Sequence, residues 1–242
     1  MYPNFELNNI SFAIPKGKIM GLVGENGAGK STTINAILDL IQPDQGAVSF
    51  WGQKLADNKS LKEDIGVVFD EINFYETLTP KKVGNIVKNA YKKWDTELYT
   101  KYLNRFDIPE DKEIKTLSKG TKMKLCIAVA LSHNPKLLIL DEATSGLDPI
   151  VRNDVLEVFL EFVRNGENSI LMSSHITTDL EKVADYITFI HNGKLLFCKP
   201  KSELLNRYGI IQCGQNDFDL IDKNDILAYK KQNSLWHVLV ED

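Results

Sequence analysis

The chain has 242 residues, 43% of them apolar and 26% charged, which is typical of a folded globular protein with one large domain or two small ones. A net charge of −4 argues against nucleic acid as a partner, because nucleic-acid-binding domains carry basic faces. Three widely spaced cysteines, Cys126, Cys198 and Cys213, argue against a disulfide framework or a zinc site and favour a reducing cytosol. No apolar run approaches membrane-spanning length, so work at a membrane would require a partner.

Apolar strands and turn signals alternate through the first part of the chain. Residues 5–12 and 18–23 are predicted strands, separated by a Pro-x-Gly turn at 15–17. A further short strand is predicted at 47–51. The β-branched run at 65–69 favours a strand that is buried on both faces.

A lysine-rich stretch of helical periodicity, residues 73–134, interrupts this plan. Apolar side chains recur in it at helical spacing, for example at Val83, Ile86 and Val87, and predict a helical subdomain inserted into an α/β core. The core then resumes with predicted strands at 136–140, 169–173, 186–191 and 194–198 and predicted helices at 150–164 and 177–184. Asn192-Gly193 predicts a two-residue hairpin between the last two strands.

The segment after Ser202 loses this alternation. Two short apolar runs, 226–229 and 235–240, predict a terminal β-hairpin with its turn at 232–234. The predicted organisation is a domain of residues 1–205, with a core of 1–72 and 135–205 around the helical subdomain 73–134, followed by a short C-terminal extension of residues 206–242.

The stretch GENGAGKST lies between an apolar run and a helical pattern, which is the context of a phosphate-binding P-loop. Glycines let the backbone turn tightly and direct several N–H groups at one anion, and the helix adds the positive end of its dipole. We expect Lys30 to reach the β- and γ-phosphates and the Ser31 hydroxyl to ligate Mg²⁺. An ordinary glycine turn is the weaker alternative. The predicted nucleotide-binding residues are Gly24, Glu25, Asn26, Gly27, Ala28, Gly29, Lys30, Ser31 and Thr32.

The apolar run at 137–140 ends in two adjacent carboxylates, Asp141 and Glu142. A buried strand would deliver Asp141 to the edge of the site, where it would hold Mg²⁺ directly or through water. Glu142 lies one residue beyond and is placed to polarise a water for attack on the γ-phosphorus. A solvated acidic turn is the alternative, but the P-loop upstream favours the catalytic interpretation.

With these motifs in order, the chain resembles the nucleotide-binding subunits of ATP-binding-cassette (ABC) transporters from Tyr2 to about Asn206. The family's Walker A motif corresponds to residues 24–32 and its Walker B motif to 137–141, so Glu142 is the implied catalytic base. The resemblance implies an α/β P-loop NTPase fold of the ABC ATPase type. That fold has a parallel-sheet core, an antiparallel β portion near the N-terminus and an inserted helical subdomain.

In this family two subunits sandwich two ATP molecules, each between the Walker A motif of one subunit and the signature motif of the other. The signature, usually LSGGQ, corresponds here to LSKGT at residues 117–121. A serine before a helical pattern is by itself only a helix cap, but the resemblance implies an anion site supplied in trans. The implied signature residues are Ser118, Lys119, Gly120 and Thr121.

Three further positions have counterparts in the family. The D-loop corresponds to SGLD at residues 145–148 and brings Asp148 to the site. His175 follows a strand and two serines and corresponds to the switch histidine that senses the γ-phosphate. Tyr2 corresponds to the aromatic residue that stacks on adenine.

The chain departs from the family pattern at two places. Asp70 stands where the family has a glutamine that touches Mg²⁺ and the attacking water, and an aspartate there is an acceptor that is able to coordinate Mg²⁺ directly. Lys119 and Thr121 replace the usual Gly and Gln of the signature. The nearby Phe74, Tyr75 and Leu78 are either core residues or part of the surface on which the family docks its membrane subunit.

The resemblance therefore implies an ATP-binding and ATP-hydrolysing subunit that powers a separately encoded membrane permease. The amino-acid sequences of the motifs are similar to those of exporters of the bacitracin-resistance and multidrug type. The implied cofactors are ATP and Mg²⁺, and the implied partners are a permease and a second ATPase subunit, in a homodimer or a heterodimer. The implied location is the cytoplasm, peripheral on the inner face of the cell membrane.

Two other functions remain open from the sequence. One is a soluble ABC ATPase outside transport, although such proteins typically carry a long coiled coil or a second cassette. The other is a nucleotide-gated regulatory module with weak hydrolysis, suggested by Asp70 and the altered signature. The presence of Glu142 and His175 argues against this second alternative.

Overall fold

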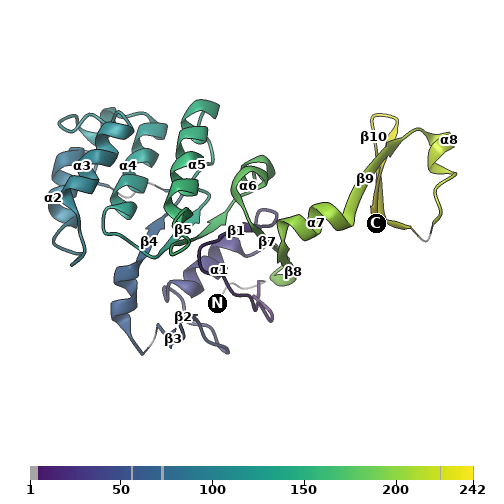
Figure 1. Ribbon diagram of the computed structural model, residues 1–242, viewed down its shortest axis with the longest axis horizontal. Helices are drawn as coiled ribbons and strands as arrows, with labels where there is room; N and C mark the ends of the chain where they lie inside the picture. Colours follow the sequence, from purple (N-terminus) through teal and green to yellow (C-terminus); the bar gives the residue numbers. More distant parts are fainter. Residues whose placement is uncertain (1–4, 56, 72–73, 224, 242) are drawn as a thin grey trace. The chain divides into compact units, whose positions relative to one another are not determined.

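The computed structural model of the chain describes residues 5–55, 57–71, 74–223 and 225–241 (Figure 1). They fall into two compact units, Met1–Cys198 and Lys199–Asp242. The division therefore comes before residue 205, where the sequence places the end of the first domain. No helix among the described residues is long and apolar enough to span a bilayer.

Within the described residues, six strands form the central sheet of the first unit, in the order β4-β5-β6-β1-β7-β8. Neighbours from β4 to β7 pair in parallel. β8 returns from β7 through Asn192 and Gly193, which both have positive φ, as the predicted hairpin requires. The strands are β1 (Ile19–Val23), β4 (Ile65–Val68), β5 (Leu137–Asp141), β6 (Ser169–Ser173), β7 (Tyr186–His191) and β8 (Lys194–Pro200).

The strands β1, β4, β5 and β6 are buried on both faces, which explains their continuous apolar runs. Successive residues of a strand point to opposite faces. Ile19 and Leu138 accordingly belong to one hydrophobic cluster, and their neighbours Met20 and Ile139 to a second one. The first cluster includes residues of the helices α2 (Pro80–Val87), α3 (Thr96–Arg105), α4 (Lys119–Leu131), α5 (Pro149–Val163) and α6 (Thr177–Val183), and the second includes Ile34 of α1 (Lys30–Ile37).

Most predicted elements of this unit are confirmed, including the parallel core and the presence of helices between residues 73 and 134. The strand predicted at 5–12 is wrong, because Asn9 adopts a φ of 57° and interrupts the extended backbone. Asn8 forms an isolated bridge with Lys194 instead. The described antiparallel pair nearest the N-terminus is short, β2 (Ser49–Phe50) with β3 (Gln53–Lys54). Two 3-10 helices, η1 (Lys59–Asp64) and η2 (Ile114–Thr116), complete the unit.

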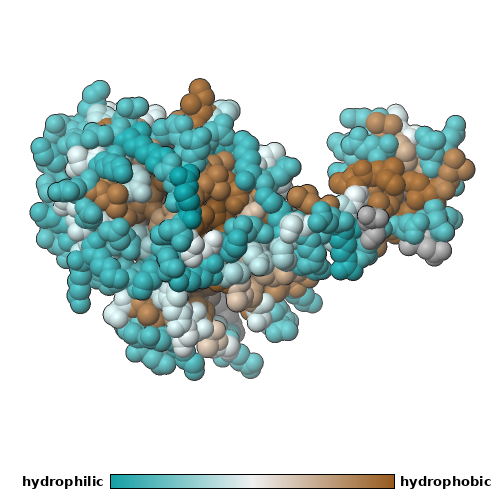
Figure 2. Space-filling view, viewed as in Figure 1, coloured by the Kyte–Doolittle hydropathy of each residue, from teal (hydrophilic) through white to brown (hydrophobic). Residues whose placement is uncertain are grey.

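The second unit is a small antiparallel sheet in the order β10-β11-β9. β10 and β11 pair through a turn at Asn233 and Ser234, while β9 adds a strand that the sequence analysis did not predict. The rings of Phe218 and Trp236 are stacked, with their centroids 4.2 Å apart. Figure 2 shows apolar side chains gathered on this unit. Its elements are α7 (Lys201–Arg207), β9 (Tyr208–Cys213), α8 (Gln215–Phe218), β10 (Ile226–Gln232) and β11 (Leu235–Glu241).

Candidate functional site

The loop between β1 and α1 is shaped by glycines that no other residue can replace without strain. A Cβ on Gly24 would lie 2.4 Å from the Ile190 carbonyl oxygen. Gly29, with a φ of 112°, precedes α1, and a Cβ there would lie 2.8 Å from the ring of Phe5. Gly29 provides no side-chain cap for the helix. The N–H groups of the first turn of α1 therefore have no intrahelical acceptor and are suited to an anion.

Lys30 is the first residue of α1, and only 6% of it is exposed. Its Nζ donates hydrogen bonds to the carbonyl oxygens of Gly24 at 2.8 Å and of Glu25 at 3.3 Å. The same Nζ lies 3.5 Å from Oε1 of Glu142. The loop thus holds a buried ammonium group beside a carboxylate, at the point where the helix begins.

Two carboxylates at the end of β5 are organised by one buried hydroxyl group. Ser173, at the end of β6, donates from Oγ to Oδ1 of Asp141 at 2.6 Å and accepts from the Glu142 N–H at 3.0 Å. Glu142 has a φ of 53°, a left-handed conformation that costs a non-glycine residue about 1 kcal/mol. The two contacts hold Asp141 in one orientation and Glu142 in this uncommon conformation.

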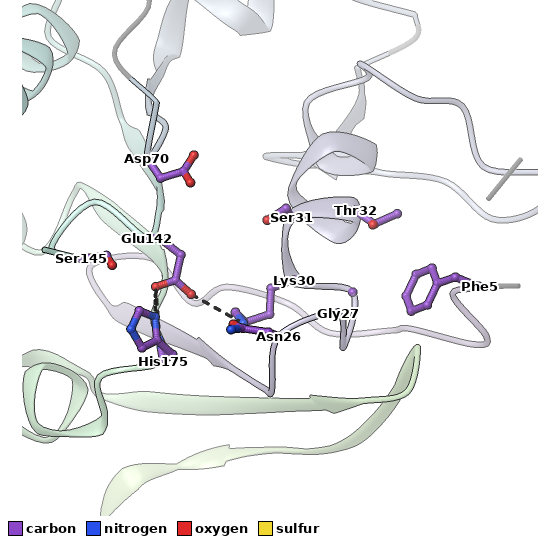
Figure 3. Close-up of a pocket in the computed structure, with 11 residues that line it drawn as sticks. Phe5, Asn26, Gly27, Lys30, Ser31, Thr32, Asp70, Glu142, Ser145 and His175 are labelled. Atoms are coloured by element: carbon purple, nitrogen blue, oxygen red, sulfur yellow. Dashed lines mark hydrogen bonds and ion pairs between the residues drawn. The ribbon is translucent and has the colours of Figure 1, made fainter. Parts of the chain in front are cut away.

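His175 completes the group of polar side chains around Glu142. Its Nδ1 lies 2.5 Å from Oε2 of Glu142. An ionised carboxylate only accepts, so the contact is a hydrogen bond in the tautomer that carries a proton on Nδ1. Figure 3 shows the Glu142 carboxylate between His175 and Lys30, facing the loop. A cation, a carboxylate and an imidazole from three separate segments are thereby brought within reach of one another.

The side chains of Lys30, Glu142 and His175 line one pocket of about 560 Å³. Many of the predicted site residues meet there, and Glu142 and His175 face the P-loop across it (Figure 3). The pocket is lined by Phe5, Asn26, Gly27, Gly29, Lys30, Ser31, Thr32, Asp70, Glu142, Ser145 and His175.

The oxygen groups predicted to hold Mg²⁺ are a hydroxyl, Ser31, and two carboxylates, Asp70 and Asp141. Ser31 and Asp70 line the pocket, and Asp141 is 6% exposed next to Glu142. Within 5–55, 57–71, 74–223 and 225–241, no cluster of three or more His, Cys, Asp or Glu side chains is able to hold a metal by itself. This donor set fits Mg²⁺, which is usually bound by one or two carboxylates together with substrate phosphates.

The signature residues are not among those that line the pocket. Ser118 is exposed and caps α4, accepting from the Thr121 N–H at 3.1 Å. Lys119, which replaces a glycine of the family motif, folds against Gly146, where a Cβ would lie 2.8 Å from its Nζ. Asp148 caps α5, and its Oδ1 accepts from the N–H groups of Ile150 and Val151, both at 3.1 Å.

Among the aromatic residues, the structure brings one to the pocket that the sequence analysis did not select. Tyr2, the predicted adenine-stacking residue, lies outside the described residues. Phe5 is the aromatic side chain that lines the pocket on the side of Thr32 (Figure 3), and its ring lies against Gly29. Ser173 was also missed, because its link to Asp141 depends on the pairing of two strands that are distant in sequence.

The glycine loop before a helix, the buried Lys30 and the carboxylates at the end of a neighbouring parallel strand define a P-loop nucleoside triphosphatase. The family model described as ABC transporter matches residues 7–145. That is more than half of the chain. This protein belongs to the ABC transporter ATP-binding family, and its fold and ATPase class are those expected from the sequence.

Similar proteins support this membership. The ABC transporter ATP-binding protein YtrB of Bacillus subtilis is 33% identical, over 95% of this chain and 77% of that protein. The bacitracin transport ATP-binding protein BcrA of Bacillus licheniformis is 32% identical, over 94% of this chain and 74% of that protein. A solved structure of the ATP-binding subunit of an ABC transporter matches with a TM-score of 0.75 and 30% identity, over 82% of this chain and 85% of that one.

Proposed function

We propose that this chain is the Mg²⁺-dependent ATPase subunit of an exporter, peripheral on the cytoplasmic face of the membrane and bound to a separately encoded permease. The observation that carries the proposal is the meeting of Lys30, Glu142 and His175 in one pocket. Phosphoryl transfer needs positioning and charge stabilisation more than covalent chemistry, and these three groups supply both. The exporter role is supported by relatives with bacitracin and lantibiotic transport names.

We assign the P-loop residues 24–32 to the phosphates, with Lys30 meeting the β- and γ-oxygens and Ser31, Asp141 and Asp70 disposed around the metal. Mg²⁺, when bound, would neutralise charge on the phosphate oxygens. Glu142 would accept a proton from the attacking water, and His175 would orient Glu142 and meet the γ-phosphate. Lys30 pairs with Glu142 in this structure, so phosphate oxygens would compete with that carboxylate for the ammonium group.

The composite site is proposed to form between two copies of this chain or between this chain and a related subunit. Exposed Ser118 at the start of a 13-residue helix, α4, is accessible to the triphosphate of an opposite subunit. Asp148 belongs to the D-loop, at the start of α5. At the base end of the nucleotide we assign Phe5 or Tyr2 to adenine. Phe5→Ala and Tyr2→Ala compared by ATP affinity decide between them, because only the stacking residue should weaken binding.

The first test is the rate of ATP hydrolysis measured against protein concentration, with and without Mg²⁺. Glu142→Gln removes the proposed base and should lower kcat by about 100-fold or more. Glu167→Gln is the matched control, since that carboxylate is 67% exposed and pairs with Lys16. A rate per subunit that rises with concentration supports the composite site. A wild-type rate equal to that of Glu142→Gln at every concentration refutes a composite site between two copies of this chain, and the same result with the related subunit added refutes the proposal.

The role of Asp70 has its own test. Asp70 adds a negative charge beside the proposed metal position, where the family has a neutral glutamine. We expect Asp70→Gln to change the rate and its dependence on the concentrations of Mg²⁺ and Mn²⁺. Unchanged rate and metal dependence would exclude Asp70 from the metal site.

Binding to the membrane is tested by co-expression with the candidate permease. The chain should sediment with membranes only when the permease is present. Sedimentation independent of any permease would contradict the proposed peripheral attachment.

A further inference from the structure

A buried ion pair joins α5 and α6, outside the pocket. Arg152, in the first turn of α5, donates from its terminal nitrogen to the Leu147 carbonyl oxygen at 2.9 Å. Its Nε faces Oδ2 of Asp179 on α6 at 3.9 Å. The side chain of Asp179 is 2% exposed, and that of Arg152 is 24% exposed.

This pair is incompletely closed. Among the described residues, Nε of Arg152 and Oδ2 of Asp179 are both buried without a hydrogen-bond partner. Their separation exceeds the usual 2.7–3.2 Å of a hydrogen bond by about 1 Å. An approach of α5 and α6 by this small amount would create a charge-assisted hydrogen bond, which is stronger than a neutral one. A closed pair would therefore be lower in energy than the pair at the separation seen here.

The two residues that Arg152 contacts, Leu147 and Asp179, each follow closely in sequence after a residue that lines the pocket. Leu147 lies two residues after Ser145, which lines the pocket, and the Ser145 N–H donates to the Glu142 carbonyl oxygen at 2.9 Å. Asp179 lies in the helix that starts two residues after His175. Arg152 thus contacts both segments that flank Glu142, one through Leu147 and the other through Asp179.

We propose that Arg152 is a positioning residue for ATP hydrolysis, which sets the spacing between the D-loop and His175 through the Arg152–Asp179 pair. Closing the Arg152–Asp179 pair moves Ser145 and His175 to the positions around Glu142 that hydrolysis requires. The inference rests on the proposed ATPase function and deepens it. An arginine is required because separate donors of one planar fork must serve Leu147 and Asp179 together, and a lysine offers a single nitrogen.

The test is steady-state ATP hydrolysis by Arg152→Lys, with kcat and KM measured separately and the melting temperature recorded. Arg152→Lys keeps a positive charge opposite Asp179, so the protein should still fold. We expect kcat to fall by about tenfold or more, with KM for ATP within about twofold, since the residue does not line the nucleotide pocket.

The matched control is Lys182→Ala. Lys182 of α6 donates to Oδ1 of Asn153 on α5 at 2.9 Å, so it joins the same two helices at an exposed place. Its removal should leave kcat near the wild-type value. A second variant, Asp179→Asn, should lower kcat, and its effect should not add to that of Arg152→Lys in the double variant, because both substitutions act through the Arg152–Asp179 pair.

The outcomes separate the two proposals. Active wild-type protein with equal kcat for Arg152→Lys and Lys182→Ala overturns this inference alone. A lowered melting temperature with unchanged kcat per ATP-binding subunit also overturns it, because the role would then be structural only. A wild-type protein without ATPase activity refutes the proposed function and this inference with it.

Discussion

Replacing Ser173 by alanine should slow ATP hydrolysis although Ser173 lines no part of the pocket surface. Its hydroxyl is fully buried and makes two hydrogen bonds, to the Asp141 carboxylate at 2.6 Å and from the Glu142 N–H at 3.0 Å. In Ser173→Ala the Asp141 oxygen loses its donor, and Glu142 keeps only the longer bond from its N–H to the Ser173 carbonyl oxygen at 3.3 Å. Asp141 and Glu142 therefore each lose a restraint at once, Asp141 on its carboxylate and Glu142 on its backbone N–H.

The size of the effect follows from these bonds. A hydrogen bond to a charged group contributes about 1.5–3 kcal/mol, and one between neutral groups about 1 kcal/mol. Because part of the Glu142 contact survives, we expect the free energy of unfolding to fall by about 2–3 kcal/mol. The displacement of Asp141 and Glu142 should lower kcat by about 10- to 100-fold and raise the Mg²⁺ concentration needed for half-maximal rate.

Ser169→Ala is the control, because Ser169 begins the same strand far from Glu142. Its hydroxyl accepts from the Gly17 N–H at 3.0 Å and donates to the Pro15 carbonyl oxygen at 3.1 Å. Urea denaturation should show a loss of stability for both variants, whereas the hydrolysis assay should show a loss of kcat for Ser173→Ala alone. Equal kcat values and equal Mg²⁺ dependence for the two variants would refute the reasoning.

Three further predictions concern the loop, a buried histidine and a half-buried thiol. Gly24→Ala should weaken ATP binding at least about tenfold, measured by titration calorimetry, because a Cβ would meet the backbone oxygen of Ile190 at 2.4 Å. Burial lowers the pKa of His133 below its ordinary value of 6.5, so the unfolded chain takes up a proton more readily. Its stabilising effect is present above pH 6.5 and is lost as the pH falls, and His133→Gln should flatten the dependence of unfolding free energy on pH in that range. Burial also raises the pKa of Cys126 to about 12, so iodoacetamide should fail to alkylate this thiol in the folded protein at about pH 8 and should alkylate it in guanidinium.

Each of these predictions has a control and a contradicting result. Gly214→Ala places a Cβ in open space, and ATP affinity equal to that of Gly24→Ala would contradict the steric argument. Parallel pH curves for wild type and His133→Gln would show that another group controls the acid loss of stability. Alkylation of Cys126 as fast in the folded protein as in guanidinium, in a Cys198→Ser and Cys213→Ser background, would contradict its raised pKa.

Contiguous motifs could be predicted from the sequence, because their chemistry lies in neighbouring residues. The P-loop is one continuous stretch from strand to helix, and the alternation of apolar runs and turn signals predicted β6 and β7 with the bounds that the structure has. The strand predicted at 5–12 failed because a single left-handed residue, Asn9, interrupts an otherwise suitable apolar pattern. A periodic pattern does not reveal such a conformation.

The contacts that join distant segments were decided by the tertiary structure. Asp141 and Ser173 meet because β5 and β6 pair in parallel with these two residues opposite each other. Arg152 reaches Asp179 because α5 packs beside α6, and Phe5 reaches the pocket because the chain before β1 folds over Gly29. The sequence by itself determined the local elements and the phosphate-binding loop. Strand order and register depend on packing the whole sheet, since a shift of one residue would turn every side chain of a strand to the other face.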